Sequence, residues 1–354
     1  MNFQDQDSKL SQILQKCSEH LLAHPSRVSC WEQLIYEIRL ATSDERTNFN
    51  HARHETLQLI ARVFFRHNPF LSKYWRWHAI DEFHHARSIE AKSIFERGLS
   101  FSSHDITLWL AYLSYRLTTT NVNVGDLLHL FEEARHAIGT NYYASEFYKL
   151  YFSFLEAYTP EINNHEQKKA LLGSQITLCP LYNHASLQER LFESGKLSSS
   201  SVSETSKVGH LLSAYVYYFE RELLFFEGLN LSRQIISLWS RYIDSMKAWL
   251  PRFAIFQLYE RALISTNFED TIVISYSNFA LERGLFNKAR NVLKKGLLCN
   301  DDMARTRILK KILMLELYEG NVLRVRDYLA QLICCNAEYS MALKGFVSKI
   351  ESLL

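Results

Sequence analysis

The strongest constraint on the fold is a pair of aromatic residues that returns along the chain with a fixed period. Trp109 follows Trp75 by 34 residues, and Val273 follows Trp239 by 34 residues. The W-x-x-Y spacing, which is complete at Trp109–Tyr112 and Trp239–Tyr242, places two large side chains on one face of a helix. A period near 34 residues with two helices per unit is typical of tetratricopeptide-like repeats, in which each unit buries its face against the next.

The second helix of each unit combines small and apolar residues. Ala91, Ala262 and Ala289 would let paired helices approach closely while the aromatic rings fill the flanking space. The chain has only 11 Gly and 5 Pro, which favours long helices joined by short loops. We therefore expect an all-α superhelix of antiparallel hairpins. Its predicted repeat core comprises Trp31, Trp75, Trp109, Tyr112, Tyr148, Tyr151, Trp239, Tyr242, Tyr259 and Tyr276.

The repeat pattern lapses between about residues 180 and 207. Residues 196–207 read KLSSSSVSETSK, a Ser-rich run without an apolar period. Such a run predicts a flexible linker. The sequence therefore predicts an N-terminal array over 1–195, a linker over 196–207 and a C-terminal array over 208–354.

Charge is nearly balanced over the whole chain but not locally. The net charge of +2 excludes a global field that would attract nucleic acid or an acidic membrane. Residues 283–311, however, carry nine basic side chains against Asp301 and Asp302. Such a run is more often a solvated outer face of the protein. The more specific functional explanation is contact with RNA phosphate or an acidic partner. The nine are Arg283, Lys288, Arg290, Lys294, Lys295, Arg305, Arg307, Lys310 and Lys311.

Residues that could carry chemistry favour a structural interpretation. His51, His54 and Glu55 have a spacing that could suit a metal, but no Cys lies nearby and Arg53 sits among them. We predict no metal site, no cofactor and no catalytic residue, since no nucleophile elbow or phosphate-binding loop occurs. Acidic residues recur at repeat positions, which favours salt bridges or helix caps over acid–base catalysis: Glu82, Glu96, Glu132, Glu260 and Glu282.

The six cysteines indicate a reducing compartment. None stands in a C-x-x-C pair, and the neighbouring Cys334 and Cys335 do not bridge easily in ordinary geometry. The N-terminus is polar and acidic, unlike a signal peptide. No run of eighteen apolar residues occurs, so we expect no membrane span and a protein of the cytosol or nucleus.

Two segments carry a resemblance to a known family. The W-x-x-Y helix followed by a helix ending E-R-G-L or E-R-A-L resembles the half-a-tetratricopeptide (HAT) repeat, which is found mostly in RNA-processing factors. Residues 68–99 resemble the opening repeat of the pre-mRNA-processing factor 39 and 42 family, and residues 258–297 resemble that family's C-terminal array. His78 and Val273 depart from the usual Tyr and Trp.

The resemblance implies a non-catalytic scaffold subunit of the U1 small nuclear ribonucleoprotein (snRNP). It would act in the nucleus during pre-mRNA splicing and 5′ splice-site recognition. Its expected partners are other U1 snRNP proteins, with direct RNA contact secondary. One alternative is a HAT scaffold of another RNA-processing complex, for 3′-end cleavage or ribosome assembly. The other is a direct RNA-binding protein that uses the basic stretch 283–311.

The C-terminal end supplies a candidate dimer contact. Apolar residues extend around the last predicted helix, whereas the terminal repeat of a monomeric array should present a polar outer face. The resemblance also implies pairing through this half, as a homodimer or as a heterodimer with a paralogous HAT protein. The candidate contact residues are Met341, Leu343, Phe346 and Ile350.

Overall fold

The computed structural model describes residues 58–66, 68–119, 123–158, 165–178, 206–228, 232–298 and 302–335, together with Gln15, Trp31, Glu32, Leu34, Gly345 and Ser348. Within these ranges every regular element is an α-helix, which confirms the predicted all-α class. The helices are α4 (Ser72–His84), α5 (Ser88–Phe101), α6 (Ile106–Thr118), α7 (Val124–Ile138), α8 (Ser145–Ala157), α9 (His165–Leu178), α11 (Ser206–Gly228), α12 (Ser232–Met246), α13 (Arg252–Ser265), α14 (Asp270–Leu281), α15 (Phe286–Gly296), α16 (Asp302–Tyr318) and α17 (Val322–Cys335).

The chain forms two compact units, residues 1–103 and 104–354. This division lies elsewhere than the predicted linker at 196–207. That linker falls outside the described residues, except for Ser206 and Lys207, which begin α11. The division into arrays over 1–195 and 208–354 therefore stays a prediction.

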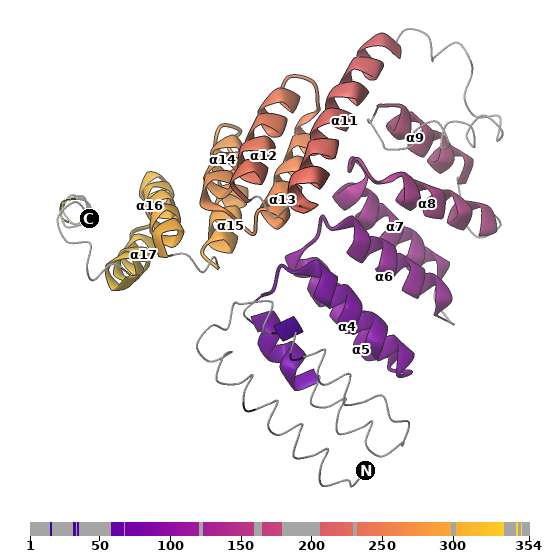
Figure 1. The fold of residues 1–354 in the computed structure, drawn as a ribbon, viewed down its shortest axis with the longest axis horizontal. Coiled ribbons are helices and arrows are strands. Elements are labelled where there is room, and N and C mark those ends of the chain that lie inside the picture. Colours follow the sequence, from indigo (N-terminus) through magenta and orange to yellow (C-terminus); the bar gives the residue numbers. More distant parts are fainter. Residues whose placement is uncertain are drawn as a thin grey trace. The chain divides into compact units, whose positions relative to one another are not determined.

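In the first unit, α4 and α5 pack side by side as a hairpin (Figure 1). Ala79 and Ala91 are fully buried and allow the close approach that the sequence predicted. The Trp75 ring stacks on Phe65, with 3.6 Å between ring centroids, and its indole N–H donates to the Pro69 carbonyl at 2.8 Å. Trp75 thereby fixes the chain segment that enters the hairpin.

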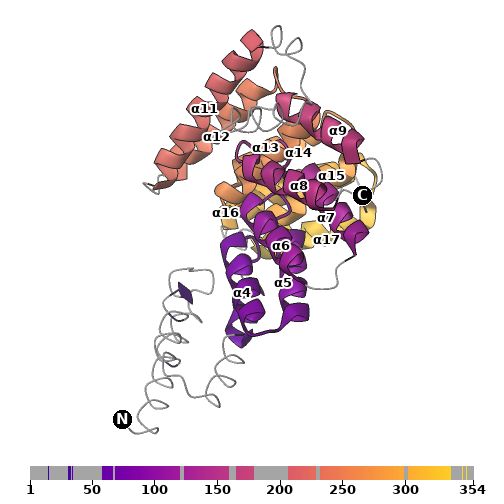
Figure 2. The ribbon, with the colours of Figure 1, turned by 90° about the vertical axis from the view of Figure 1, so that its right-hand side faces the viewer.

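In the second unit, helices pair in the same way in several places, such as α14 with α15 and α16 with α17, and both ribbon views show α11 beside α12 (Figures 1 and 2). Polar caps begin two of its helices, because the Asp105 carboxylate accepts from the Leu108 N–H and the Asn123 amide oxygen from the Gly125 N–H. Gly284 and Gly320 adopt positive φ in the turns after α14 and α16, where a side chain would be strained. Short turns thus close the α14–α15 and α16–α17 hairpins.

Gly296 on α15 lies where neighbouring helices leave no room for a side chain. A Cβ atom built there would lie 2.8 Å from Val273 Cγ1 of α14 and 3.0 Å from Ile308 Cδ1 of α16. Both side chains are fully buried and have little room to move. The absence of a side chain at Gly296 is therefore part of how α14, α15 and α16 pack.

We expect Gly296→Ala to lower the free energy of unfolding by about 1–3 kcal/mol, the usual cost of overpacking a filled core. Urea unfolding would measure the change. Gly125→Ala is the matched control, since its Cβ would meet nothing closer than Asn123 at 3.4 Å. There we expect no loss and a gain of up to about 1 kcal/mol from helix propensity. Equal stability of the two variants would contradict the close packing at Gly296.

Candidate interaction surfaces and an aromatic pocket

The ten aromatic residues predicted as repeat core are all buried, each with at most 6% of its surface exposed. Tyr259 and Tyr276 illustrate the packing, because their rings stack across α13 and α14 with centroids 4.8 Å apart. Rings buried in this way have no free face on which an RNA base could stack. The buried set is Trp31, Trp75, Trp109, Tyr112, Tyr148, Tyr151, Trp239, Tyr242, Tyr259 and Tyr276.

Tyrosine hydroxyls link consecutive helices through glutamates. Tyr151 on α8 donates to Glu132 on α7 at 2.5 Å, and Tyr276 on α14 donates to Glu260 on α13 at 2.8 Å. Burial, and then the neighbouring carboxylate, raises the pKa of both tyrosines well above the ordinary value. Each phenol therefore stays protonated and serves as a donor. We call these contacts the tyrosine–glutamate links.

A third tyrosine–glutamate link includes a buried ion pair. Tyr242 on α12 donates to Glu220 on α11 at 3.0 Å, and Arg261 on α13 donates to both oxygens of the same carboxylate at 2.8 and 2.9 Å. Burial alone would lower the pKa of Arg261, but the Glu220 charge outweighs it and raises that pKa. The Arg261 guanidinium also lies 5.3 Å from the Trp239 ring centroid. One carboxylate thus joins three helices.

Most of the basic stretch 283–311 is engaged within the fold. Arg290 is 7% exposed and donates to Glu316 at 2.5 Å, while Arg307 pairs with the buried Asp270. Arg290 is therefore not available to RNA or an acidic partner, contrary to its place among the predicted contacts. Four further cations have internal contacts: Arg283 over the Phe279 ring, Lys288 over the Phe256 ring, Lys295 beside Glu260, and Arg305 on the Leu297 carbonyl.

Three cations of the stretch remain without a partner among the described residues: Lys294, Lys310 and Lys311. Lys294 is exposed, and Lys310 and Lys311 are partly exposed. Three lysines form a much smaller positive surface than the nine basic residues that the sequence counts. Their contact with RNA or an acidic partner stays a prediction.

Several predicted features fall outside the described residues. They include the candidate dimer contacts Met341, Leu343, Phe346 and Ile350, and the group His51, His54 and Glu55. In the part of the chain that the structure describes, no group of three or more His, Cys, Asp or Glu side chains is placed to hold a metal ion. Over the same residues, no helix combines the length and apolar character needed to cross a membrane.

Helix α11 leaves a broad aromatic face exposed. It buries Val216, Phe219, Glu220 and Leu223, which are spaced as one helical stripe. Five apolar or aromatic side chains around that stripe are about half exposed or more, and exposed apolar side chains gathered on one helix are typical of interaction sites in soluble proteins. We call them the α11 face: Tyr215, Tyr217, Tyr218, Leu224 and Phe225.

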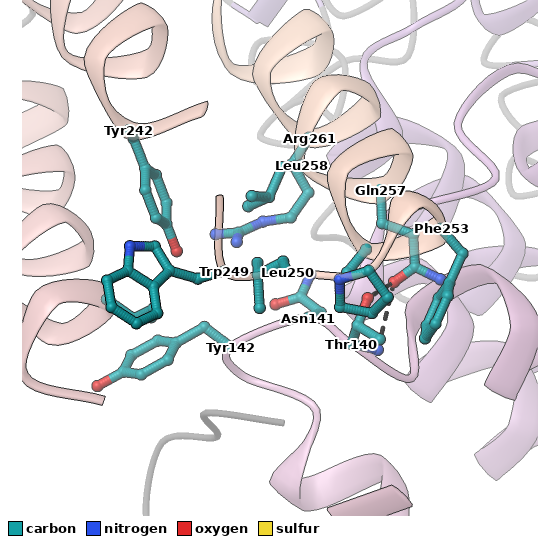
Figure 3. A pocket seen from close by; sticks show the side chains of 13 residues that line it. Thr140, Asn141, Tyr142, Tyr242, Trp249, Leu250, Phe253, Gln257, Leu258 and Arg261 are labelled. Atoms are coloured by element: carbon teal, nitrogen blue, oxygen red, sulfur yellow. Dashed lines mark hydrogen bonds between the residues drawn. The ribbon is translucent and has the colours of Figure 1, made fainter. Parts of the chain in front are cut away.

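A pocket of about 360 Å³ opens beside α11, where the turn after α7 meets the turn between α12 and α13 (Figure 3). Its volume lies within the usual range for binding sites, roughly 300–1,000 Å³. Trp249 and Phe253 line it although 56% and 57% of their surfaces are exposed. The other lining residues are Thr140, Asn141, Tyr142, Val216, Tyr242, Leu250, Pro251, Ala254, Gln257, Leu258 and Arg261.

Gln257 holds this junction together. Its amide N–H₂ donates to the His136 carbonyl at 2.6 Å, and its amide oxygen accepts from the Thr140 N–H at 3.2 Å and from the Thr140 hydroxyl. The His136 carbonyl and the Thr140 N–H are backbone groups at the end of α7 whose hydrogen bonds the helix itself cannot supply. One side chain of α13 therefore caps a helix more than a hundred residues earlier in the chain.

Gln257→Leu should lower the free energy of unfolding by about 1–2 kcal/mol, because it removes the partner of the partly buried His136 carbonyl and Thr140 N–H. Chemical denaturation would measure this loss. The matched control is Gln331→Leu on α17, where the side chain is exposed and we expect a change within about 0.5 kcal/mol. If the two variants unfold at the same denaturant concentration, Gln257 does not hold the junction.

The sequence did not predict this pocket. Two signals could have indicated an exposed aromatic turn here: Trp249 stands outside the aromatic period, and it precedes Pro251, the N-cap of α13. Neither signal indicates that the turn before Pro251 contacts residues 140–142. That contact depends on the stacking of helices distant in sequence.

Paired helices with buried W-x-x-Y residues and tyrosine–glutamate links define a HAT-repeat protein. A family described as PRP39 N-terminal HAT repeat matches residues 15–182. Pre-mRNA-processing factor 39 of Schizosaccharomyces pombe (strain 972 / ATCC 24843) is 23% identical over 178 residues, which cover 50% of this chain and 28% of that relative. The resemblance to the PRP39 family is therefore confirmed over residues 15–182, and the matched part covers about a quarter of the curated relative.

Proposed function

We propose that the protein is a non-catalytic scaffold subunit of the U1 snRNP that acts in the nucleus in pre-mRNA splicing and 5′ splice-site recognition. The proposal rests on the similarity of residues 15–182 to the PRP39 family and on the similar protein in Schizosaccharomyces pombe, which carries a pre-mRNA-processing name. A scaffold works by presenting rigid surfaces, because rigidity keeps the entropic cost of assembly low.

The observation that best supports a scaffold is the combination of internal rigidity with exposed apolar surface. The tyrosine–glutamate links and Gln257 fix one helix against the next. The α11 face leaves aromatic area exposed. Direct RNA binding through residues 283–311 has less support, since six of the nine basic side chains contact groups within the fold.

Affinity purification of the tagged chain from nuclear extract tests the proposal. We expect U1 small nuclear RNA and U1 proteins to co-purify. Treatment with ribonuclease should leave protein subunits bound if protein contacts dominate. Recovery of a 3′-end cleavage complex or of ribosome-assembly factors in place of U1 components would overturn it.

We propose further that the C-terminal array pairs with a second copy or a paralogous HAT protein. The support is the apolar run Met341, Leu343, Phe346 and Ile350 in the sequence. Light scattering should report a dimer for the full chain and a monomer after truncation at Glu338. A full chain that stays monomeric and recovers no paralogue from cells would contradict this assembly.

A further inference from the structure

The mouth of the aromatic pocket carries two exposed rings on a restrained stretch of backbone. Trp249 lies in the turn between α12 and α13, where its N–H and that of Leu250 both donate to the Met246 carbonyl, at 3.0 and 2.9 Å. Phe253 follows Pro251, whose φ of −63° suits the start of α13. Because the backbone of the turn is already restrained, binding a partner through these rings costs little conformational entropy.

The interior of the pocket is mostly apolar and offers one free amide. Leu250 and Leu258 supply aliphatic wall (Figure 3), and Ala254 also lines the pocket. Asn141 is 5% exposed; its amide oxygen accepts from the Tyr143 N–H at 3.0 Å, and its amide N–H₂ has no partner among the described residues. The pocket thus suits a large apolar group accompanied by one hydrogen-bond acceptor, such as a peptide carbonyl.

One unpaired cation stands at the edge of the pocket. On α12 and in the turn after it, Asp244 is paired with Lys247 at 2.7 Å. Arg252, at the start of α13, is exposed and has no partner among the described residues. Arg252 stands between the lining residues Pro251 and Phe253. An acidic segment would therefore be attracted to this edge of the pocket.

We propose that the pocket binds an aromatic side chain from an acidic segment of a partner protein. The ring fills the apolar interior, its peptide carbonyl accepts from the Asn141 amide, and flanking carboxylates face Arg252. A nucleobase fits less well, because the polar edges of a base would be buried against apolar wall with few donors or acceptors to satisfy them. The partner is therefore a peptide and not a single-stranded RNA.

Four labelled probes test the proposal by fluorescence anisotropy with the full chain. The first is a capped pentapeptide with a central Phe between two Asp-Glu pairs. In the second, Ala replaces the Phe, and in the third, Lys replaces each acidic residue. The fourth is a ten-nucleotide oligouridine. We expect the first peptide to bind at least about tenfold more tightly than the second, because a buried aromatic anchor supplies most of the energy of such contacts.

Two variants locate the binding site. Trp249→Ala should weaken the first peptide by at least about tenfold, and Arg252→Glu should weaken it by about fivefold. Both residues are exposed, so both variants should fold, and their melting temperatures would be measured alongside. The matched controls on α17 are Leu323→Ala and Arg326→Glu, both exposed, which should bind the peptide as the parent does.

The inference is overturned if the first peptide fails to bind, if it binds no better than the Ala peptide, or if Trp249→Ala leaves its affinity unchanged. Tighter binding of the oligouridine, weakened by the same variants, would assign the pocket to RNA and also overturn it. The inference rests on the proposed scaffold role in one respect, that the bound partner is a protein. Purification without U1 components would refute the scaffold role but would not change the result of the peptide titration.

Discussion

Arg261→Met should destabilise the protein by about 3–5 kcal/mol, because it leaves the charge of Glu220 buried without its cation. The side chain of Glu220 is 3% exposed and that of Arg261 is 14% exposed, so water cannot replace the lost partner. Urea unfolding would measure the loss. Arg326→Met on α17 is the control, where an exposed arginine is removed and we expect a change within about 0.5 kcal/mol.

A second substitution separates the effect of charge from that of packing. Adding Glu220→Gln to Arg261→Met removes the stranded charge and keeps an oxygen that can accept from the Tyr242 hydroxyl. The double variant should therefore recover about 1–2 kcal/mol of the loss. A double variant that is less stable than Arg261→Met would show that the guanidinium stabilises the unit by packing over Trp239 and not by neutralising Glu220.

Trp109→Ala should also cost about 3–5 kcal/mol, the usual effect of emptying a buried aromatic site. Trp109 is 6% exposed and packs on α6 near Tyr112, with ring centroids 6.4 Å apart. Differential scanning calorimetry would record the fall in melting temperature. Trp249→Ala is the matched control, since the same side chain is 56% exposed there and should cost about 1 kcal/mol or less. Equal melting temperatures would show that the repeat core does not stabilise the fold.

The helical repeats and their core could be predicted because burial in a helical hairpin follows a short local period. Trp75, Tyr151 and Tyr276 are buried for the same reason, their position on the inward face of a helix. The surfaces could not be predicted in the same way. A count of charges in the sequence finds the cations of residues 283–311. It does not include Asp270 and Glu316, which lie outside that stretch and pair with Arg307 and Arg290 in the structure.

The pocket could not be predicted either, because its residues are distant in the sequence. Thr140 and Gln257 are 117 residues apart, and neither residue type signals that the other is near. The tyrosine–glutamate links are an intermediate case. Recurrence of Glu132 and Glu260 suggested contacts between helices, but the partner hydroxyls became evident only from the structure.

The tyrosine–glutamate links and the Gln257 contact place different constraints on how the array can change in length. A tyrosine–glutamate link joins a helix only to its neighbour, so a whole repeat can be duplicated or lost at the end of the array while the remaining links form again. Gln257 instead reaches back to the end of α7, which fixes the set of helices enclosed between them. Loss of one helical pair from that interval would move Gln257 away from Thr140 and abolish the pocket. Variants of this architecture can therefore change length freely at their ends, but not across the junction.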